Sequence, residues 1–432
     1  MVDEGREPKR PARIALVLSG GGARGAYEAG VLSYLFTEIA PRLGREVHFD
    51  IVTGASVGAI HACYVAAYQN SSDAWARLAE IWRGLTLDRV FPVGASELFS
   101  VPLRLLGLAP APKPLPAKGE LPQRLPGLFE VGWLEHIVLQ EIEWQLIRDH
   151  IDSGSLHALA VAATEIATGR AVIFADTKDG QLPPWSRDEF VVAKSARIGP
   201  AHALASAAIP LVFPAVRLTG AYYADGGLRL NTPLSPALRL GADRVLVISL
   251  QHGRTKADDD RLARHRETNF TSPVYLAGKA LNALLIDRIE HDLDRLRLLN
   301  RILAAGVSAY GAGFVDRIND VVVVERRAPY RIVQEMSIRP SEDLGALAGK
   351  CLGRMSRARG ISDWLSRTFV RYAGRGGMAE PDLLSYLLFD NCYTDRLIAL
   401  GREDAEAVAD RLVDFFSGSG AAMAPRRPAT SA

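Results

Sequence analysis

The sequence predicts an α/β fold with a largely parallel sheet, and three features of its first 70 residues lead to this prediction. Ile14 to Leu18 is a short apolar run that ends at glycines, which is typical of a buried strand. Apolar residues at helical spacing follow from Gly25 to Ile39. A second apolar run at 49–52 leads through the turn TGASVG into a helical pattern at 59–68. This alternation of strands and helices favours a parallel sheet covered by helices.

The composition fits a folded chain without a dominant charge. Of 432 residues, 48% are hydrophobic and 23% are charged, which is an ordinary globular balance that supplies a sizeable core. The 51 basic and 49 acidic residues leave a formal net charge of +2, which gives no signal for nucleic-acid binding. The length allows one large α/β domain with an extension, or two to three domains.

The cysteines and the N-terminus bear on the cellular compartment. Cys63, Cys351 and Cys392 have no close paired spacing, so we expect neither a disulfide framework nor a cysteine zinc site, and a reducing compartment fits. The charged N-terminus is not a secretory signal, and no apolar run reaches the ~20 residues that a membrane span needs. We therefore expect a cytoplasmic protein without a transmembrane segment, and peripheral contact with a membrane surface stays open.

The glycine loop after the first strand allows two interpretations. Gly20, Gly22 and Gly25 fit the pattern G-x-G-x-x-G, which by itself is a weak signal for dinucleotide binding. That function also needs an acidic residue at the end of the second strand, where the chain has Thr53 and Gly54 instead. A P-loop would need Lys followed by Ser or Thr, which the loop lacks. Both phosphate-binding interpretations lose support.

The turn after the second strand offers a nucleophile. GASVG, from Gly54 to Gly58, matches G-x-S-x-G between a strand and a helix, which is the setting that the motif requires. Ser56 would lie at the tip of the turn, although a serine that caps the helix would fit the same place. The first two strands are expected to be neighbours, so the N–H groups of the glycine loop could converge on an oxyanion near Ser56.

The base that would activate Ser56 has two kinds of candidate. His61 lies on the same helix and should point away from Ser56. Histidines placed like His202 and His252 are more often loop or surface residues than catalytic bases. Asp225 follows a short aromatic strand and precedes two glycines, which suggests a carboxylate held on a tight turn. By itself an Asp-Gly turn of purely structural function would explain this pattern.

Three motifs taken together are more specific. Gly20 to Gly25, Gly54 to Gly58 and Asp225 to Gly227, in this order and spacing, resemble the patatin-like phospholipase family, and the resemblance covers about 14–250. It implies a three-layer patatin-like fold, in which helices flank a central, mostly parallel sheet, followed by a helix-rich C-terminal extension. We expect a flexible N-terminus (1–12), a catalytic core (13–252) with a proline-rich loop (106–128), the extension (253–416) and a disordered tail (417–432).

The resemblance implies a serine acyl hydrolase that acts on phospholipid or lysophospholipid without a metal or another cofactor. Ser56 would be the nucleophile and Asp225 the base, as a catalytic dyad. The remaining site residues that it implies are the oxyanion-hole loop Gly20, Gly21, Gly22, Ala23, Arg24 and Gly25, in which Arg24 supports the loop, and the motif glycines Gly54, Gly58, Gly226 and Gly227. The alternative is a non-hydrolytic nucleotide-binding or regulatory protein that uses Gly20–Gly25 for phosphates. No nucleic-acid partner is expected, and the oligomeric state stays open.

The proline-rich stretch and the C-terminal half carry weaker predictions. Prolines prevent regular structure in 106–128, while its leucines supply apolar surface, so we expect a flap beside the active site, with a plain disordered insertion as the alternative. Beyond 253, a long helical pattern runs from 274 to 303, and apolar runs at 321–325 and 331–335 suggest a late pair of strands.

Overall fold

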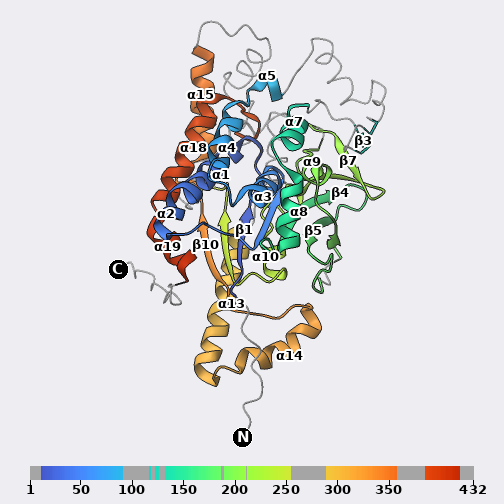
Figure 1. Ribbon diagram of the computed structural model, residues 1–432, viewed down its shortest axis with the longest axis vertical. Helices are drawn as coiled ribbons and strands as arrows, with labels where there is room; N and C mark the ends of the chain where they lie inside the picture. Colours follow the sequence, from blue (N-terminus) through green and yellow to red (C-terminus); the bar gives the residue numbers. More distant parts are fainter. Residues whose placement is uncertain are drawn as a thin grey trace, which may run out of the picture.

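A central sheet with helices on both faces organises the chain, as expected for an α/β protein (Figure 1). The computed structural model describes residues 11–90, 116–117, 122–125, 132–185, 189–210, 212–253, 289–357 and 385–418. The predictions for the N-terminus, the C-terminal tail and the proline-rich flap fall largely outside these residues. Within the described residues, ten strands join in a single mixed sheet, which confirms the predicted fold class.

The sheet is parallel at its centre and antiparallel on one side. The strands are β1 (Ile14–Leu18), β2 (Ile51–Ala55), β3 (Arg124–Leu125), β4 (Ala158–Glu165), β5 (Ala171–Thr177), β6 (Val191–Ser195), β7 (Ala215–Leu218), β8 (Ala221–Asp225), β9 (Arg244–Ile248) and β10 (Gln334–Ile338). Strands β10, β9, β1, β2 and β4 pair in parallel in that order. The sheet continues through β8, β7 and β3 with antiparallel pairing, and β5 and β6 branch from β4.

Helices cover both faces. The α-helices are α1 (Gly25–Tyr34), α2 (Ala40–Leu43), α3 (Val57–Tyr68), α4 (Ala74–Arg83), α5 (Leu87–Val90), α7 (Gly132–Gln140), α8 (Trp144–Ser153), α9 (Pro200–Ser206), α10 (Leu234–Arg239), α13 (Ile289–Tyr310), α14 (Phe314–Arg326), α15 (Leu344–Arg357), α18 (Asn391–Glu406) and α19 (Ala409–Ser417). A π-helical turn, Leu35–Ile39, continues α1, and short 3₁₀ turns follow β1 and β8.

Strand β1 shows why its sequence is apolar throughout. Leu16 and Leu18 face the core shared with α1, α3 and α18, whereas Ala15 and Val17 face the core shared with α10 and α13. All four side chains are fully buried. A parallel strand with helices on both faces needs apolar residues at every position, because successive side chains point to opposite faces.

The C-terminal segment is part of the main core. Helices α1 and α18 cross so closely that a Cβ on Gly30 would lie 2.2 Å from the carbonyl oxygen of Ile398. A Cβ on Gly401 would lie 2.2 Å from the carbonyl oxygen of Tyr27. Only hydrogen atoms fit at these two positions, so the crossing depends on both glycines. Strand β10, which also follows residue 253, pairs with β9 at the edge of the sheet.

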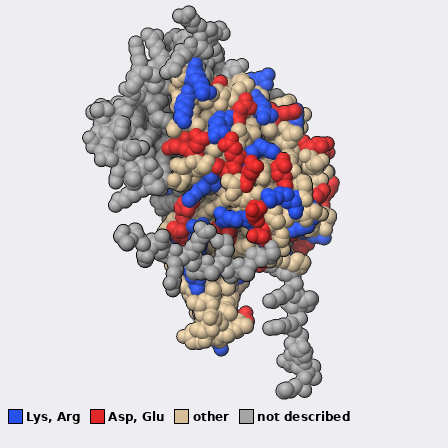
Figure 2. All heavy atoms as spheres, turned by 90° about the vertical axis from the view of Figure 1, so that its left-hand side faces the viewer, with Lys and Arg blue, Asp and Glu red and all other residues tan. Residues whose placement is uncertain are grey.

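Paired charges cover the outer surface of these C-terminal helices. Figure 2 shows basic and acidic side chains interspersed on this side of the molecule. Arg42 contacts Asp410 at 2.7 Å, which joins α2 to α19. Arg402 of α18 contacts Glu38 at 3.0 Å. This side therefore presents no surface of a single charge sign.

One predicted strand is wrong. Residues 321–325 lie in α14 instead of a strand, and Val321 and Val324 are 68% and 63% exposed. A run of valines can form a helix, because valine lowers helix stability by only a fraction of a kcal/mol relative to alanine. The preference of valine for strands depends on the packing around it. Here α14 packs against α13, where the ring of Phe314 fills the space above Gly306. The second predicted strand does form, slightly later, as β10.

The cysteines also differ from expectation. Cys351 of α15 and Cys392 of α18 form a disulfide, with their Cα atoms 5.9 Å apart. The sequence separation of 41 residues concealed this pair, because only the packing of α15 on α18 brings the two thiols together. Cys63 is buried and unpaired with another cysteine.

Candidate active site

Ser56 lies at a sharp turn between β2 and α3. Its backbone has φ 54° and ψ −129°, a region that residues other than glycine seldom adopt. A Cβ on Gly54 would lie 2.1 Å from the carbonyl oxygen of Gly58, and a Cβ on Gly58 would lie 2.6 Å from that of Ser19. The G-x-S-x-G pattern therefore reflects backbone contacts that leave no room for side chains at either glycine.

Asp225 lies at the end of β8, directly beside Ser56. The Ser56 hydroxyl donates a hydrogen bond of 2.6 Å to Oδ2 of Asp225, and the Gly227 N–H donates one of 2.7 Å to Oδ1. A Cβ on Gly226 would lie 2.1 Å from the carbonyl oxygen of Ala162, so the turn after Asp225 packs directly on β4. The two residues singled out by the sequence motifs are in contact.

Strand β4 sets their relative position. It pairs in parallel with β2, where Ala55 lies opposite Ala162. It also pairs antiparallel with β8, where Ala163 lies opposite Asp225. The turn at Ser56 and the end of β8 thus meet across neighbouring residues of one strand. Strands β2 and β8 do not pair with each other. Their shared register with β4 therefore brings the Ser56 hydroxyl to the Asp225 carboxylate.

The environment of Asp225 changes its acidity. Asp225 is 1% exposed and Ser56 is 5% exposed. Burial raises the pKa of Asp225 from its ordinary value of 3.8 to about 6, while the hydrogen bonds from Ser56 and Gly227 act in the opposite direction. At neutral pH the carboxylate is therefore mostly ionised, yet it is a stronger base than an ordinary aspartate.

The glycine loop after β1 passes beside Ser56 and is joined to the segment after Asp225. A Cβ on Gly20 would lie 2.9 Å from Cβ of Ser56. The Gly20 N–H donates to the carbonyl oxygen of Asn231 at 3.0 Å, and Nδ2 of Asn231 donates to the Gly20 carbonyl at 3.1 Å. Sequence reasoning missed Asn231, for which the available signal was a polar residue within the stretch LRLNTPL.

The next two glycines differ from Gly20. The N–H groups of Gly21 and Gly22 donate no hydrogen bond to another residue in the described part of the chain. Gly22 has φ +55°, and a Cβ there would lie 2.3 Å from the carbonyl oxygen of Tyr386. A Cβ on Gly21 would lie 2.4 Å from Cδ1 of Leu250. The loop is therefore enclosed by residues that follow the matched motifs in sequence.

Arg24 contacts the C-terminal segment instead of the space near Ser56. Its Nε donates to Oγ of Ser385 at 2.7 Å, and its guanidinium carbon lies 4.1 Å from the ring centroid of Tyr386. Arg24 is only 9% exposed. These contacts tie the glycine loop to a segment more than 360 residues later, which no local pattern could reveal.

His61 belongs to a buried polar chain beneath the loop. The indole Nε1 of Trp82 can only donate, so Nε2 of His61 accepts at 2.9 Å, and Nδ1–H of His61 is left to donate to Glu28 at 2.7 Å. Glu28 also accepts the Ser19 N–H at 2.8 Å, and burial raises the pKa of Glu28. Both ring nitrogens of His61 are thus engaged away from Ser56, as expected.

The other two candidate histidines lie elsewhere. Nδ1 of His202 accepts the Gly199 N–H at 3.2 Å, and burial lowers the pKa of His202 to about 4. Nδ1 of His252 lies 2.9 Å from the carbonyl oxygen of Pro340. Among the described residues, neither histidine is hydrogen-bonded to Ser56.

An apolar pocket opens beside Ser56. Its enclosed volume is about 60 Å³, and the space reaches about 660 Å³ when the open region at its mouth is included. Helices α3, α4 and α7 and the C-terminal segment line it with side chains that include Ile60, Trp82, Trp133 and Phe389. The rings of Trp82 and Phe389 stack, with centroids 6.4 Å apart.

The described ranges contain neither a candidate metal site nor a candidate membrane-spanning helix. No three His, Cys, Asp or Glu side chains there gather in a way that could hold a metal ion. None of the helices in those ranges combines the length and the apolar character needed to cross a bilayer.

Comparisons with known proteins give the family of the chain. A cGAMP-activated phospholipase from Pseudomonas aeruginosa is 32% identical over 228 residues, which cover 52% of this chain and 55% of that protein, so the chain spans about half the length of this curated relative. The crystal structure of VipD from Legionella pneumophila aligns with 93% of this chain and 67% of its own at 13% identity, with a TM-score of 0.32. The model of the patatin-like phospholipase family matches residues 16–238, a range that includes Ser56, Asp225 and the glycine loop, and the chain belongs to this family.

Proposed function

We propose that this protein hydrolyses fatty-acyl esters of lipids, with Ser56 as nucleophile and Asp225 as general base. The observation that carries the proposal is the hydrogen bond of 2.6 Å between the two side chains, in a buried position at the mouth of an apolar pocket. Membership of a phospholipase family supports the same class of reaction. Phospholipid and lysophospholipid are the substrates that we favour.

The proton balance fits a two-residue mechanism. As Ser56 Oγ attacks the ester carbonyl, its proton passes to Oδ2 of Asp225, and it then leaves with the departing alcohol. Water donates its proton to the same carboxylate when it attacks the acyl-enzyme, which restores Ser56. An ordinary aspartate is a weak base for a hydroxyl, so a pKa of about 6 for Asp225 assists both steps.

The oxyanion would be held by Gly21 and Gly22. Of the three consecutive glycines Gly20, Gly21 and Gly22, Gly20 already donates its N–H to Asn231, so we assign the donor function to the other two. Asn231 would hold Gly20, and Arg24 would hold the far end of the loop through Ser385 and Tyr386. Preorganised backbone donors stabilise the charge that develops on the carbonyl oxygen.

The apolar pocket would take the acyl chain. Tyr64 lines it and lies eight residues beyond Ser56 on α3, which corresponds to about 12 Å along the helix. Ile142 also lines it, and the N–H of its neighbour Glu143 donates to Tyr68, one turn further along α3. The pocket therefore extends well past the reacting atoms, as a long hydrocarbon chain requires. We keep peripheral contact with a membrane surface as part of this proposal.

The nucleotide-binding alternative has less support. A phosphate on the Gly20–Gly25 loop would be bound most strongly with a basic side chain beside it. Arg24, the basic side chain that could pair with a phosphate there, contacts Ser385 and Tyr386 instead. The name of the Pseudomonas relative describes activation by cGAMP, and we propose for this chain only the hydrolytic activity.

A fluorophosphonate probe tests the proposal. The probe should label the purified wild-type protein and fail to label Ser56→Ala, while Ser153→Ala, which removes an exposed serine hydroxyl on α8, should label normally. Release of fatty acid from phosphatidylcholine vesicles and from lysophosphatidylcholine should follow the same pattern. Equal labelling of wild type and Ser56→Ala would show that Ser56 is not the nucleophile.

The division of the chain into a core at 13–252 and an extension at 253–416 also remains a proposal. Its test is expression of residues 1–253 alone. The contacts of Tyr386 with Gly22 and of Ser385 with Arg24 lead us to expect that this shorter chain is inactive even where it folds.

A further inference from the structure

A second cavity lies at the opposite edge of the sheet from Ser56. Its volume is about 460 Å³, within the range of ligand sites. Arg13 directly precedes β1, His157 directly precedes β4, and Arg239 ends α10 before β9, so all three lie at the amino ends of parallel strands. Ser56 follows the carboxyl end of β2. The length of a five-residue strand, about 17 Å, separates the two edges.

The lining of this cavity is strongly basic. Arg13, Lys178, Arg239 and Arg331 line it together with one acidic residue, Asp179, and we call these five residues the basic cavity. Asp243 lies close by, 3.6 Å from Arg331.

Like charges are held together at this place. Nη1 of Arg239 donates to the carbonyl oxygen of Arg326 at 3.4 Å. Burial and the charge of Arg326 lower the pKa of Arg239, and burial and the charge of Arg331 lower that of Arg326. Guanidinium groups that repel one another in a partly buried position favour the binding of an anion, which relieves the repulsion.

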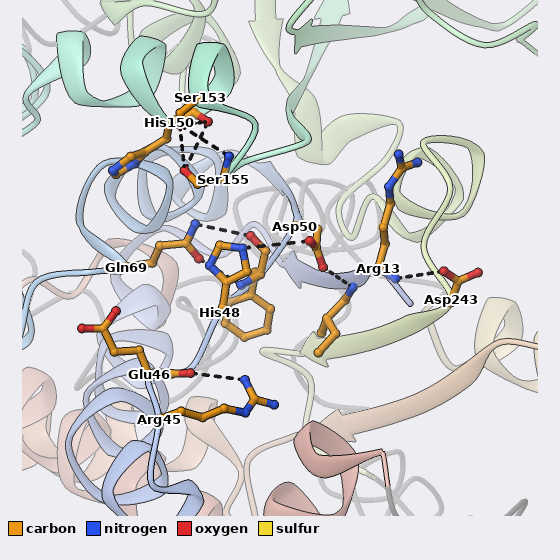
Figure 3. Close-up of polar contacts among 12 residues, drawn as sticks. Arg13, Arg45, Glu46, His48, Asp50, Gln69, His150, Ser153, Ser155 and Asp243 are labelled. Atoms are coloured by element: carbon orange, nitrogen blue, oxygen red, sulfur yellow. Dashed lines mark hydrogen bonds and ion pairs between the residues drawn. The ribbon is translucent and has the colours of Figure 1, made fainter. Parts of the chain in front are cut away.

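The framework of the cavity is anchored by backbone contacts. The Arg13 N–H donates to Oδ2 of Asp243 at 2.9 Å, and the Ile14 N–H donates to Oδ2 of Asp50 at 2.7 Å. The carbonyl oxygen of Asp50 accepts the N–H of His157 at 2.7 Å. Figure 3 shows Asp50, which directly precedes β2, and the side chain of Arg13, which extends away from the carboxylate of Asp243. The strand ends are therefore fixed before any ligand binds.

We propose that the basic cavity binds a small soluble organic phosphate with two or more negative charges, such as a nucleotide. Arginine recognises phosphate through paired hydrogen bonds, and several arginines suit more than one phosphoryl group. Ile151, Leu156 and Leu240 also line the cavity and offer apolar surface to a carbon-containing part of the ligand. The site lies outside the proposed hydrolase site, and neither proposal depends on the other.

Isothermal titration calorimetry without lipid tests the proposal, with ATP and pyrophosphate as probes. We expect both to bind the wild-type protein. Lys178→Gln and Arg331→Gln should each weaken binding tenfold or more, because each removes a charged partner of the phosphate. Lys178 is exposed, so Lys178→Gln should fold even where Arg331→Gln does not. Arg42→Gln, which removes an exposed arginine on α2, should bind like the wild type.

Two further arms separate the alternatives. Ser56→Ala should bind ATP like the wild type, so that a failure of the hydrolase proposal is distinguishable from a failure of this one. Vesicles of phosphatidylglycerol test a lipid headgroup as the source of phosphate. Binding of these vesicles without binding of ATP or pyrophosphate would overturn the assignment to a soluble ligand. Absence of ATP and pyrophosphate binding at millimolar concentration, or equal binding by Lys178→Gln and the wild type, would also overturn it.

Discussion

Replacing Asp225 with asparagine should abolish hydrolysis and at the same time stabilise the fold at neutral pH. The carboxylate is buried and its charge is unfavourable there, which is why its pKa rises to about 6. Asparagine has nearly the same shape but no charge. Its Oδ1 can still accept the Gly227 N–H, and its Nδ2–H can donate to the Ser56 hydroxyl oxygen, which reverses the direction of the wild-type hydrogen bond. The variant therefore loses the base and also loses the cost of burying it.

The size of the effect follows from the two pKa values. A tenfold change in an acid dissociation constant corresponds to about 1.4 kcal/mol, so the rise of the Asp225 pKa from 3.8 to about 6 corresponds to about 3 kcal/mol. The folded chain holds this proton more tightly than the unfolded chain does. The protonated carboxyl therefore contributes stability below about pH 4, and this contribution is lost as the pH rises through about 6.

The expected difference is measurable. Unfolding entropy of about 2.1 cal/mol/K per residue over 432 residues gives about 0.9 kcal/mol/K, so about 3 kcal/mol raises Tm by about 3 °C at pH 8. The difference in Tm between Asp225→Asn and the wild type should shrink to nothing near pH 4. Thermal unfolding followed by circular dichroism from pH 4 to pH 8 measures it. Asp149→Asn, which neutralises an exposed carboxylate on α8, is the matched control and should show no such trend.

Activity provides the second measurement. The kcat/KM of the wild type for a short-chain ester should fall as the pH drops below about 6, because Asp225 must be ionised to accept the proton. Retention of most activity by Asp225→Asn would refute the role of Asp225 as base. An inactive variant that is no more stable than the wild type at pH 8 would refute the argument from the buried charge.

Three further changes test other parts of the structure. Gly22→Ala should lower turnover about 100-fold or more, the usual effect of losing an oxyanion donor, whereas Gly44→Ala, at φ +64° in open space, should leave it unchanged. Ile142→Trp should impair hydrolysis of long-chain esters and spare short-chain esters in a direct comparison of kcat/KM, because Ile142 lines the apolar pocket. Cys351→Ser should lower the free energy of unfolding in urea by about 4 kcal/mol, from closure of a loop of 41 residues.

Local patterns predicted the sheet centre well, because that part of the fold depends on local sequence. The bounds of β1 match the predicted run from Ile14 to Leu18. Strand β2 was predicted to end at Val52, yet it continues to Ala55, since Gly54 and Ala55 carry the chain up to the turn at Ser56. A strand that ends in small residues is hard to predict from sequence, because the prediction relies on β-branched and aromatic side chains.

Contacts between distant segments were not predictable in the same way. The approach of Asn231 to Gly20 and that of Ser385 to Arg24 join residues more than 200 positions apart. Each involves a polar residue whose local sequence would suit an ordinary turn or surface. The disulfide of Cys351 with Cys392 depends likewise on the packing of α15 against α18. A single sequence shows only patterns of spacing along the chain, and these distant pairs follow no such pattern.

The contacts of the C-terminal segment change how the motifs themselves should be interpreted. Gly22 meets the Tyr386 carbonyl, Arg24 meets Ser385, and Phe389 lines the pocket beside Ser56. Helix α18, which follows this segment, is held on α1 by the glycine crossing, and α1 begins where the glycine loop ends. The loop is thus fixed at one end by Asn231 and at the other by residues outside the family match. Because backbone donors act only when they are held in place, the segment around Ser385 and Tyr386 belongs to the proposed catalytic machinery as much as the motifs do.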